Sequence, residues 1–405
     1  MPSARPVAER AAAAAPPSLA LRPADWLQLG LFWLGGFSLR VTLLAVPPVI
    51  PQIHRQLGLD EKGISILTGL PVLLLAAGAV PGAVLIARIG PRRALVTGLV
   101  VIAAGSALRG LGPSLQVLFG ATLVMGIGVA VSQPAFPTLT RDWFPLRVAL
   151  ATAAYANGLL VGETVPASLT GPFVLPALGG SWPLSFLFWS LPVVVTAILI
   201  AILTRQAPPD PAVARRWWPD FRSPRLWMLG IVMGCASAAY FGANTFLPDF
   251  VRATGRPQFK DASLTAINIC QVPASILVMT MARRLIGRRW PFLVAGLLIA
   301  TGSALLALTP GAWVIAWAGV VGFGAALTLI LTLALPPLLA GAGDVHRFSA
   351  GVFLIMYSCS FAGPLLGGAA WDATGSPVTP FLALAAFGLL MSGLSFSLPV
   401  IRGRF

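Results

Sequence analysis

The sequence predicts an all-α membrane protein with twelve transmembrane helices arranged as two pseudo-symmetric bundles of six. Three observations lead to this fold class. The 405 residues are 57% hydrophobic and 10% charged, whereas soluble domains are about a quarter charged. Apolar stretches of membrane-spanning length recur along the whole chain. The second half of the chain also repeats features of the first half at a constant offset.

The predicted spans follow one another closely along the chain. A spanning helix needs roughly 20 mostly apolar residues. Before the first of them, residues 1–25 contain no apolar run followed by a cleavage site, so we expect a cytoplasmic tail rather than a signal peptide. The twelve stretches lie at about 26–51, 63–87, 94–112, 115–137, 148–172, 182–204, 226–250, 263–283, 291–309, 312–338, 348–370 and 378–400.

Loop charges set the expected orientation. With the N-terminus inside, 20 of the 27 Lys and Arg residues fall in inside segments and 6 in outside segments. Basic residues concentrate in cytoplasmic loops of membrane proteins. We therefore expect a multi-pass protein of a bacterial inner membrane with both termini in the cytoplasm. This distribution also explains the net charge of +15 without a nucleic-acid partner.

The longest polar stretch inside the chain divides it into two halves. Residues 205–225 are rich in Pro and Arg, which is typical of a linker. This boundary predicts an N-terminal six-helix bundle over 26–204 and a C-terminal bundle over 226–400. Residues 401–405 form a short cytoplasmic tail.

The two halves resemble each other. ARIGPRR at 87–93 and RRLIGRR at 283–289 follow the second span of each half, and their glycines are 197 residues apart. Gly-x-Gly motifs begin at Gly126 and Gly322, an offset of 196. Pro51 and Pro248, each near the outer end of the first span of its half, are also 197 residues apart. Three matches near one offset indicate an internal duplication. Parallel repeats of this kind are built around an axis normal to the membrane in one large class of transporters.

At this level the sequence resembles the major facilitator superfamily over nearly its whole length. The loop at 87–93 is similar to that superfamily's glycine–acid–basic loop motif, with Ala87 in the place of the usual acid. The resemblance implies the major facilitator fold, transport by alternating access rather than enzymatic activity, and a gating role for Arg92 and Arg93.

A narrower resemblance is to the cyanate permease and nitroimidazole transporter family. This resemblance implies a small anion or compact polar solute as substrate, such as a cyanate-like ion or a small organic acid. The chain departs from the family pattern at Val41, Gln133-Pro134 and Glu163, which favours that broad class over cyanate itself. The matching segments are Leu39-Arg40, Leu108-Arg109, Tyr155, Tyr240, Leu247-Pro248, Gln271-Val272-Pro273 and residues 363–380.

Arg40 is an ionisable residue inside an apolar span. It lies 14 residues beyond Trp26, which places it roughly 21 Å along a helix and near the middle of the bilayer. A charge at that depth faces the bundle interior or a water-filled cavity. We therefore expect Arg40 to bind an anionic substrate through its fork of donors. The alternative is a structural ion pair that joins two helices.

Glu163 is the second ionisable residue inside a span. It lies 15 residues after Val148, at a depth similar to that of Arg40, so the two charges can pair. Glu163 is either a proton site that couples or gates transport, as in a symporter or antiporter, or a plain structural partner. The sequence leaves both interpretations open.

Polar residues in other spans are candidates for lining a central cavity. Hydrogen-bond donors from both halves could bind one anion selectively, while the alternative is contact between helices. We leave open whether Gln133, near the inner end of the fourth span, gates the path or caps a helix. The candidates for substrate binding besides Arg40 are Tyr155, Tyr240, Asn244, Gln271 and Tyr357.

Other features predict no metal, cofactor or nucleotide site. His54 and His346 are expected in loops as lone surface residues, and Arg109 is expected to extend its charge toward the outer membrane surface. The partners expected are a small solute, lipid and, with Glu163, protons, for a chain that acts as a monomer. A proton-driven exporter of drugs or nitroimidazoles is the main alternative, and a membrane enzyme or a receptor is a third.

Overall fold

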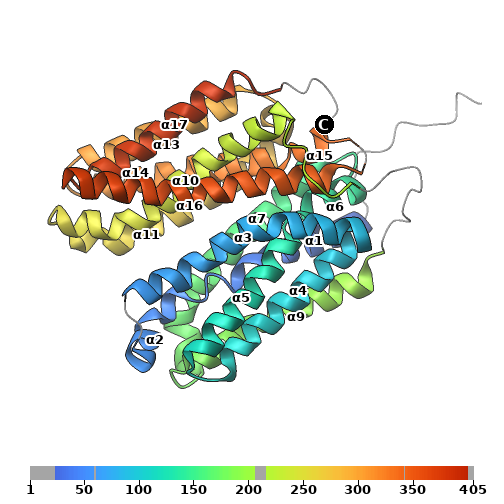
Figure 1. Cartoon of the computed structure of the whole chain (residues 1–405), viewed down its shortest axis with the longest axis horizontal. Helices are drawn as coiled ribbons and strands as arrows, with labels where there is room; N and C mark the ends of the chain where they lie inside the picture. Colours follow the sequence, from blue (N-terminus) through green and yellow to red (C-terminus); the bar gives the residue numbers. More distant parts are fainter. Residues whose placement is uncertain (1–22, 59–60, 206–215, 342, 400–405) are drawn as a thin grey trace, which may run out of the picture.

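The computed structural model describes residues 23–58, 61–205, 216–341 and 343–399, and these are helical with short connections. Figure 1 shows two helical bundles side by side, one from each half of the chain. The first contains α1 (Pro23–Val41), α2 (Ile50–Leu57), α3 (Glu61–Ile89), α4 (Pro91–Leu108), α5 (Leu115–Ser132), α6 (Ala135–Trp143), α7 (Val148–Leu169), α8 (Leu175–Ala177) and α9 (Trp182–Leu203). The second contains α10 (Pro224–Ala253), α11 (Lys260–Ile269), α12 (Gln271–Leu285), α13 (Trp290–Leu308), α14 (Trp313–Leu333), α15 (Pro336–Leu339), α16 (Val345–Thr374) and α17 (Thr379–Ser395).

Ten helical stretches of the described chain are long and apolar enough to cross a membrane. The last predicted span corresponds to α17, which is apolar but shorter, at 17 residues. The first predicted span, at 26–51, is not one helix, so that prediction was wrong. Helix α1 ends at Val41, and a 3-10 turn over Pro47–Val49 leads into α2. Two successive prolines at this turn supply no N–H for a continuous helix.

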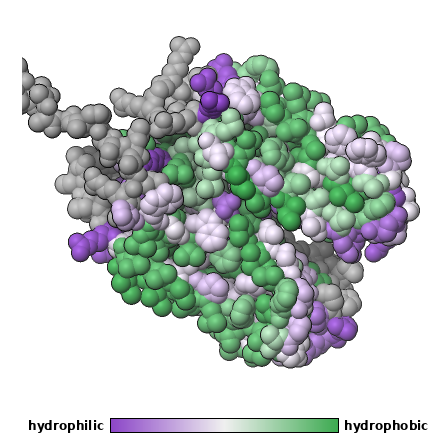
Figure 2. All heavy atoms as spheres, turned by 180° about the vertical axis from the view of Figure 1, so that it is seen from behind, coloured by the Kyte–Doolittle hydropathy of each residue, from purple (hydrophilic) through white to green (hydrophobic). Residues whose placement is uncertain are grey.

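The outer surface of α9 shows how the bundles face lipid. Large apolar side chains are exposed at a helical spacing, and Ile202 is 72% exposed. Figure 2 shows broad hydrophobic areas of the same kind on one face of the molecule. Such a surface is unfavourable in water and suits a hydrocarbon environment. The exposed residues on α9 are Leu187, Leu191, Val195, Ile198 and Ile202.

Glycines occupy equivalent places in the two bundles. A Cβ added at Gly128 would press on α4, and one at Gly324 would press on α13, the preceding span in each half. In the same way Gly126 faces α3 and Gly322 faces α11, each belonging to the second span of its half. The repeated Gly-x-Gly motif therefore performs the same packing task twice, because a residue without a side chain lets helices approach closely.

The repeated loop motif has a similar explanation. Gly90 follows α3 with φ of 85°, and Gly287 follows α12 with φ of 75°. Positive φ is strained for residues with a Cβ. Each glycine therefore allows the tight reversal between the second and third spans of its half.

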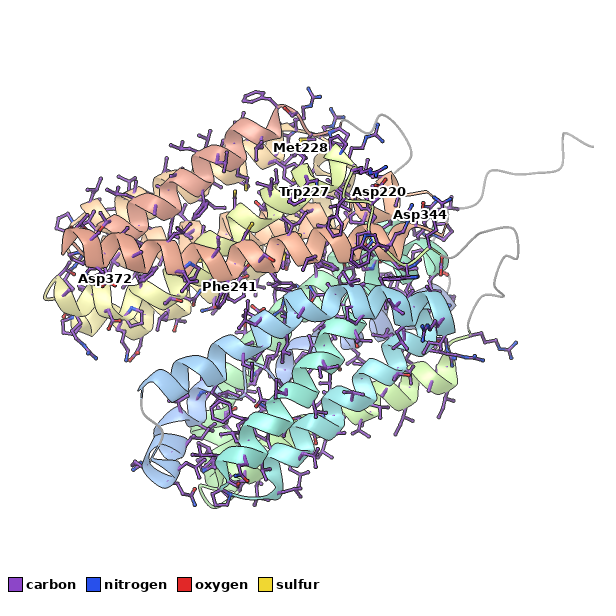
Figure 3. All side chains as sticks on the ribbon, viewed as in Figure 1. Asp220, Trp227, Met228, Phe241, Asp344 and Asp372 are labelled. Carbon is purple, nitrogen blue, oxygen red and sulfur yellow. The ribbon has the colours of Figure 1, made fainter. Side chains whose placement is uncertain are left out.

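The bundles contact each other through α3 with α16 and through α7 with α12, and they close together at one end of the molecule. We call this the closed end; the helices that begin there include α1, α4, α10, α13 and α16. It also carries α6 and α15, which contact each other across the two bundles. Figure 3 shows Asp220 and Asp344 at this end and Asp372 at the opposite end. At that opposite, open end, the ribbons of α2 and α11 lie apart, and Figure 2 shows a hollow in the surface between the bundles.

Candidate functional site

Close packing of α1 on α7 positions the two membrane-embedded charges. Gly158 and Gly162 of α7 lie directly against the backbone of Trp33 and Phe37 of α1, so that any added Cβ would collide with a carbonyl oxygen. This contact brings α1 and α7 to backbone distance over two turns. Arg40 lies in the last turn of α1 and Glu163 directly follows Gly162, so the packing places the two side chains together.

Arg40 and Glu163 form an ion pair. Arg40 Nε lies 3.4 Å from Glu163 Oε1, and the two side chains are 9% and 13% exposed. This separation is longer than the 2.7–2.9 Å typical of a charge-assisted hydrogen bond. Nε has no hydrogen-bond partner, while Nη2 donates to the Tyr357 hydroxyl at 3.2 Å. The guanidinium therefore retains donors for a further acceptor.

Tyr357 joins the second bundle to the first. It comes from α16, is 1% exposed, and reaches Arg40 on α1. Its hydroxyl also lies between the two ends of the Gln133 amide, 2.7 Å from Nε2 and 2.9 Å from Oε1. Gln133 directly follows α5 and lies with Pro134 between α5 and α6, so the hydroxyl connects two parts of the first bundle to α16.

Tyr240 of α10 extends the contacts on the other side of the ion pair. Its hydroxyl lies 3.4 Å from Glu163 Oε2 and donates to Asn268 Oδ1 at 2.6 Å. Asn268 Nδ2 donates to Asn244 Oδ1 at 3.3 Å, and Gln271 Nε2 donates to Asn268 Oδ1 at 3.5 Å. We call the whole set the central network. Its members are Arg40, Gln133, Glu163, Tyr240, Asn244, Asn268, Gln271 and Tyr357.

Asn268 was missed by the sequence analysis, although it occupies the middle of the second arm of the network. A second polar contact between the bundles was missed as well. Asn157 Oδ1 accepts from Trp33 Nε1 at 2.8 Å, and its Nδ2 donates to Ser275 Oγ at 2.7 Å. Trp33 also stacks on Phe37, with ring centroids 5.7 Å apart. The available signal was an amide side chain inside an apolar stretch.

Tyr155 lies apart from the central network, contrary to its predicted place beside the substrate. It is 2% exposed and packs inside the first bundle against Phe32 and Phe136, with ring centroids 5.4 Å and 4.9 Å away. Eight residues separate Tyr155 from Glu163, which turns their directions apart by about 80° on a helix. That angle is enough to direct Tyr155 into the aromatic interior.

Of the arginines at the closed end, the two predicted to gate differ from Arg141 in the contacts that they make. Arg92 donates to the Thr204 hydroxyl at 2.9 Å and to the Ala201 carbonyl at 2.5 Å, both in its own bundle. Arg93 is exposed. By contrast, Arg141 of α6 crosses to the second bundle and donates to the carbonyl of Ala340, which precedes the α16 segment.

Two expectations about isolated polar residues were wrong. Arg109 is 0% exposed, so its charge does not reach the membrane surface. His346 is 4% exposed, and its Nε2 lies 2.9 Å from the Arg216 carbonyl, so it is not a surface residue. The His54 side chain lies outside the described part. Within the described part of the chain, no group of His, Cys, Asp or Glu side chains could hold a metal ion.

Comparison with known proteins identifies the class to which this fold and site belong. The family model described as Major Facilitator Superfamily matches residues 32–267, more than half of the chain. The chain therefore belongs to the major facilitator superfamily and is a membrane transporter rather than an enzyme.

Individual relatives agree with this assignment. The chain is 27% identical to the cyanate transport protein CynX of Escherichia coli (strain K12), over 89% of this chain and 95% of that protein. It is 28% identical to the 2-nitroimidazole transporter of the same organism, over 88% of this chain and 91% of that protein. The resemblance stated from sequence motifs is thereby confirmed.

Solved structures share the fold. The human organic anion transporter MFSD10 (TETRAN) matches with a TM-score of 0.76 and 16% identity, covering 93% of this chain and 100% of that one. The transporter FucP in the outward conformation matches with a TM-score of 0.71 and 15% identity, covering 91% of this chain and 98% of that one. The predicted fold class, with its two six-helix bundles, is confirmed.

Proposed function

We propose that this transporter moves a small anion across the bacterial inner membrane by alternating access, and that Arg40 binds the anion. The observation that carries the proposal is the position of Arg40, buried where the two bundles meet and with Nε free of a hydrogen bond. Tyr357 and Tyr240 approach the ion pair from the opposite bundle. An anion bound there would contact both bundles, as alternating access requires.

The chemistry of the site suits a compact acceptor. A guanidinium offers a planar fork of N–H donors, and tyrosine hydroxyls and amides can complete the contacts. Cyanate, named in one relative, is a small monoanion, and the nitro group of 2-nitroimidazole, named in another, carries two acceptor oxygens. Both could accept from Arg40. This shared property supports a small anion or a compact group with two acceptors as the substrate class.

Glu163 couples this binding to protons in our proposal. The ion pair with Arg40 is neutral as a whole, so an added anion would leave a net negative charge in a buried site. Such a charge is costly away from water. Uptake of one proton by Glu163 with each anion would keep the total charge unchanged and release Arg40 to the substrate. The transporter would then act as an anion–proton symporter.

The closed end faces the cytoplasm in this proposal. It carries Arg92, Arg141 and Arg347, whose loops belong to the basic set expected inside. Basic loops remain on the cytoplasmic side of most membrane proteins. The open end would then face the outside, and the structure would correspond to an outward-facing state that receives substrate from that side.

A binding measurement on purified protein tests the proposal. Thermal unfolding is followed in detergent with cyanate and with formate, for the wild type, Arg40→Ala and the control Arg256→Ala. Arg256 lies in the second bundle and donates to the carbonyl of Thr309, away from the central network. A ligand at about 100 times its Kd stabilises a protein by about 2.7 kcal/mol. We expect this stabilisation in the wild type and the control, and none in Arg40→Ala. Equal stabilisation of all three proteins would contradict the assignment of Arg40.

Export of a nitroimidazole-type compound is a second candidate, supported by the stacked pair of Trp33 and Phe37 beside Asn157. Aromatic faces bind planar rings by stacking. If 2-nitroimidazole stabilises the wild type and Arg40→Ala equally but fails to stabilise Trp33→Leu, this candidate replaces the anion transporter.

A further inference from the structure

Arg109 is a buried cation with no acidic partner among the described residues. It follows α4 directly and is 0% exposed. Its Nη2 donates to the Thr42 carbonyl at 2.8 Å and to Ser106 Oγ at 3.3 Å, and its guanidinium carbon lies 4.4 Å from the centre of the Phe186 ring. A buried charge of this kind normally needs compensation by negative charges or by hydrogen-bond acceptors. Its environment must therefore supply negative potential.

Two helix ends supply that potential. Helix α1 ends at Val41 and α4 ends at Leu108, and Arg109 lies at both C-terminal ends. The C-terminal end of a helix carries about half a negative elementary charge. Two such ends amount to about one charge, and the face of the Phe186 ring adds a further attraction for a cation. These dipoles and the ring offset part of the cost of burying the guanidinium, whose Nε and Nη1 have no hydrogen-bond partner among the described residues.

The contact with Thr42 lies at the break in the first span. The backbone N–H groups of Leu43 and Leu44 both bond to the Arg40 carbonyl, so the helix tightens and ends there. The Thr42 carbonyl accepts a hydrogen bond from Arg109 Nη2. Thr42 is two residues from Arg40. Arg109 therefore holds the segment that immediately follows the proposed anion-binding residue.

We infer that Arg109 is a positioning residue for Arg40. It fixes the end of α1 by binding the Thr42 carbonyl, and its charge cancels the negative end of α1 that an anion at Arg40 would otherwise meet. This inference rests on the proposed anion site and gives that site a second, indirect source of positive potential. The contacts of Arg109 with Thr42, Ser106 and Phe186 include no member of the central network.

The test compares anion affinity in three variants with the wild type. Arg109→Gln removes the charge, and Arg109→Lys keeps it but loses the planar guanidinium whose Nη2 contacts both Thr42 and Ser106. The control is Arg256→Gln, because Arg256 also binds helix-end carbonyls, at Thr309 and Gly311, and also faces an aromatic ring. Apparent Kd values for cyanate and for formate come from thermal-shift titrations at constant ionic strength, alongside the unfolding temperature without anion.

We expect Arg109→Gln to weaken anion binding by about tenfold, equivalent to about 1.4 kcal/mol, and Arg109→Lys by about threefold. The control should change the affinity by less than about twofold while lowering the unfolding temperature, which separates lost stability from lost affinity.

A folded Arg109→Gln protein with the wild-type Kd overturns the inference. If that variant cannot be purified in a folded form, the Arg109→Lys protein is measured in its place. A wild-type Kd in Arg109→Lys then overturns the inference. A wild type that neither anion stabilises contradicts the proposed function and this inference with it. A wild type that binds normally, with Arg109 variants that also bind normally, contradicts the inference alone.

Discussion

Two tyrosines show how much the surroundings of one hydroxyl decide its role. The Tyr357 hydroxyl contacts Arg40 and Gln133, whereas the Tyr155 hydroxyl is buried with no hydrogen-bond partner among the described residues. Removing a hydroxyl that satisfies buried groups leaves those groups unpaired, while removing one that is itself unpaired costs little. The same substitution should therefore have opposite effects at the two positions.

We predict that Tyr357→Phe lowers the free energy of unfolding by about 1–3 kcal/mol and weakens anion binding, because Arg40 and Gln133 lose a partner. Tyr155→Phe is the matched control and should be neutral or slightly stabilising. Chemical or thermal unfolding of both proteins, with and without formate, measures the difference. Equal losses in the two variants would show that the central network contributes no more than ordinary packing.

Glu163 gives a prediction about pH. If a proton enters with the anion, the apparent affinity rises as pH falls, by up to about tenfold per pH unit for one proton. Replacing the carboxylate with an amide removes this linkage. It also removes the negative charge that competes with the anion for the Arg40 guanidinium. Glu163→Gln should therefore bind formate at least as tightly as the wild type, with an affinity that is the same at pH 6 and pH 8. A wild-type affinity that does not change with pH would exclude proton coupling at this residue.

At the scale of helices, the contact between α1 and α7 determines the site. Gly162 lies against the Phe37 backbone, and Glu163 follows it. Adding a methyl group there forces the two helices apart by overpacking. Gly120 in α5 has open space around it and is exposed, so it serves as a control.

We predict that Gly162→Ala destabilises the protein by about 1–3 kcal/mol and weakens anion binding, because it shifts Arg40 relative to Glu163. Gly120→Ala should be neutral or stabilising by up to about 1 kcal/mol, since Ala favours helix over Gly. Unfolding temperatures and formate titrations of both variants provide the measurement. The packing argument fails if the two variants behave alike.

The sequence predicted the elements better than their interruptions. Apolar length locates a span because lipid requires it, but continuity depends on local hydrogen bonding. The first span breaks after Val41, and other spans are interrupted between α5 and α6 and between α11 and α12. Arg109 was misjudged for this reason. Its distance from the end of a span suggested an exposed charge, while the break in α1 created a buried set of acceptors.

The candidate site was predictable to the extent that charges are rare in apolar spans. Arg40 and Glu163 stand out in such a background because an unpaired charge in lipid is costly. Neutral residues such as Asn157 and Asn268 do not stand out, since polar residues join helices in many membrane proteins. The contacts of Asn157 with Ser275 and of Asn268 with Tyr240 join residues more than 20 positions apart along the chain, so these contacts depend on how helices pack together rather than on local pattern.

At the scale of the whole molecule, Arg141 connects the bundles at the closed end. We predict that Arg141→Ala increases the population with that end open by about tenfold, because losing a charged hydrogen bond costs about 1.5–3 kcal/mol. Arg93→Ala, at an exposed arginine of the same end, should have no such effect. Spin labels at Leu146 and Trp290, exposed positions on different bundles, report the separation in a background without the three native cysteines. Unchanged distance distributions in Arg141→Ala would remove Arg141 from the closing mechanism.

The acceptors that Arg141 uses have a consequence for sequence variation. They are the main-chain oxygens of Ala340 and Gly341, which every amino acid carries. Point substitutions at 340 or 341 therefore leave the acceptors in place, whereas the donor side depends on one side chain. We therefore expect most substitutions of Arg141 to be poorly tolerated, whereas the residue types at positions 340 and 341 can vary during evolution without loss of this contact.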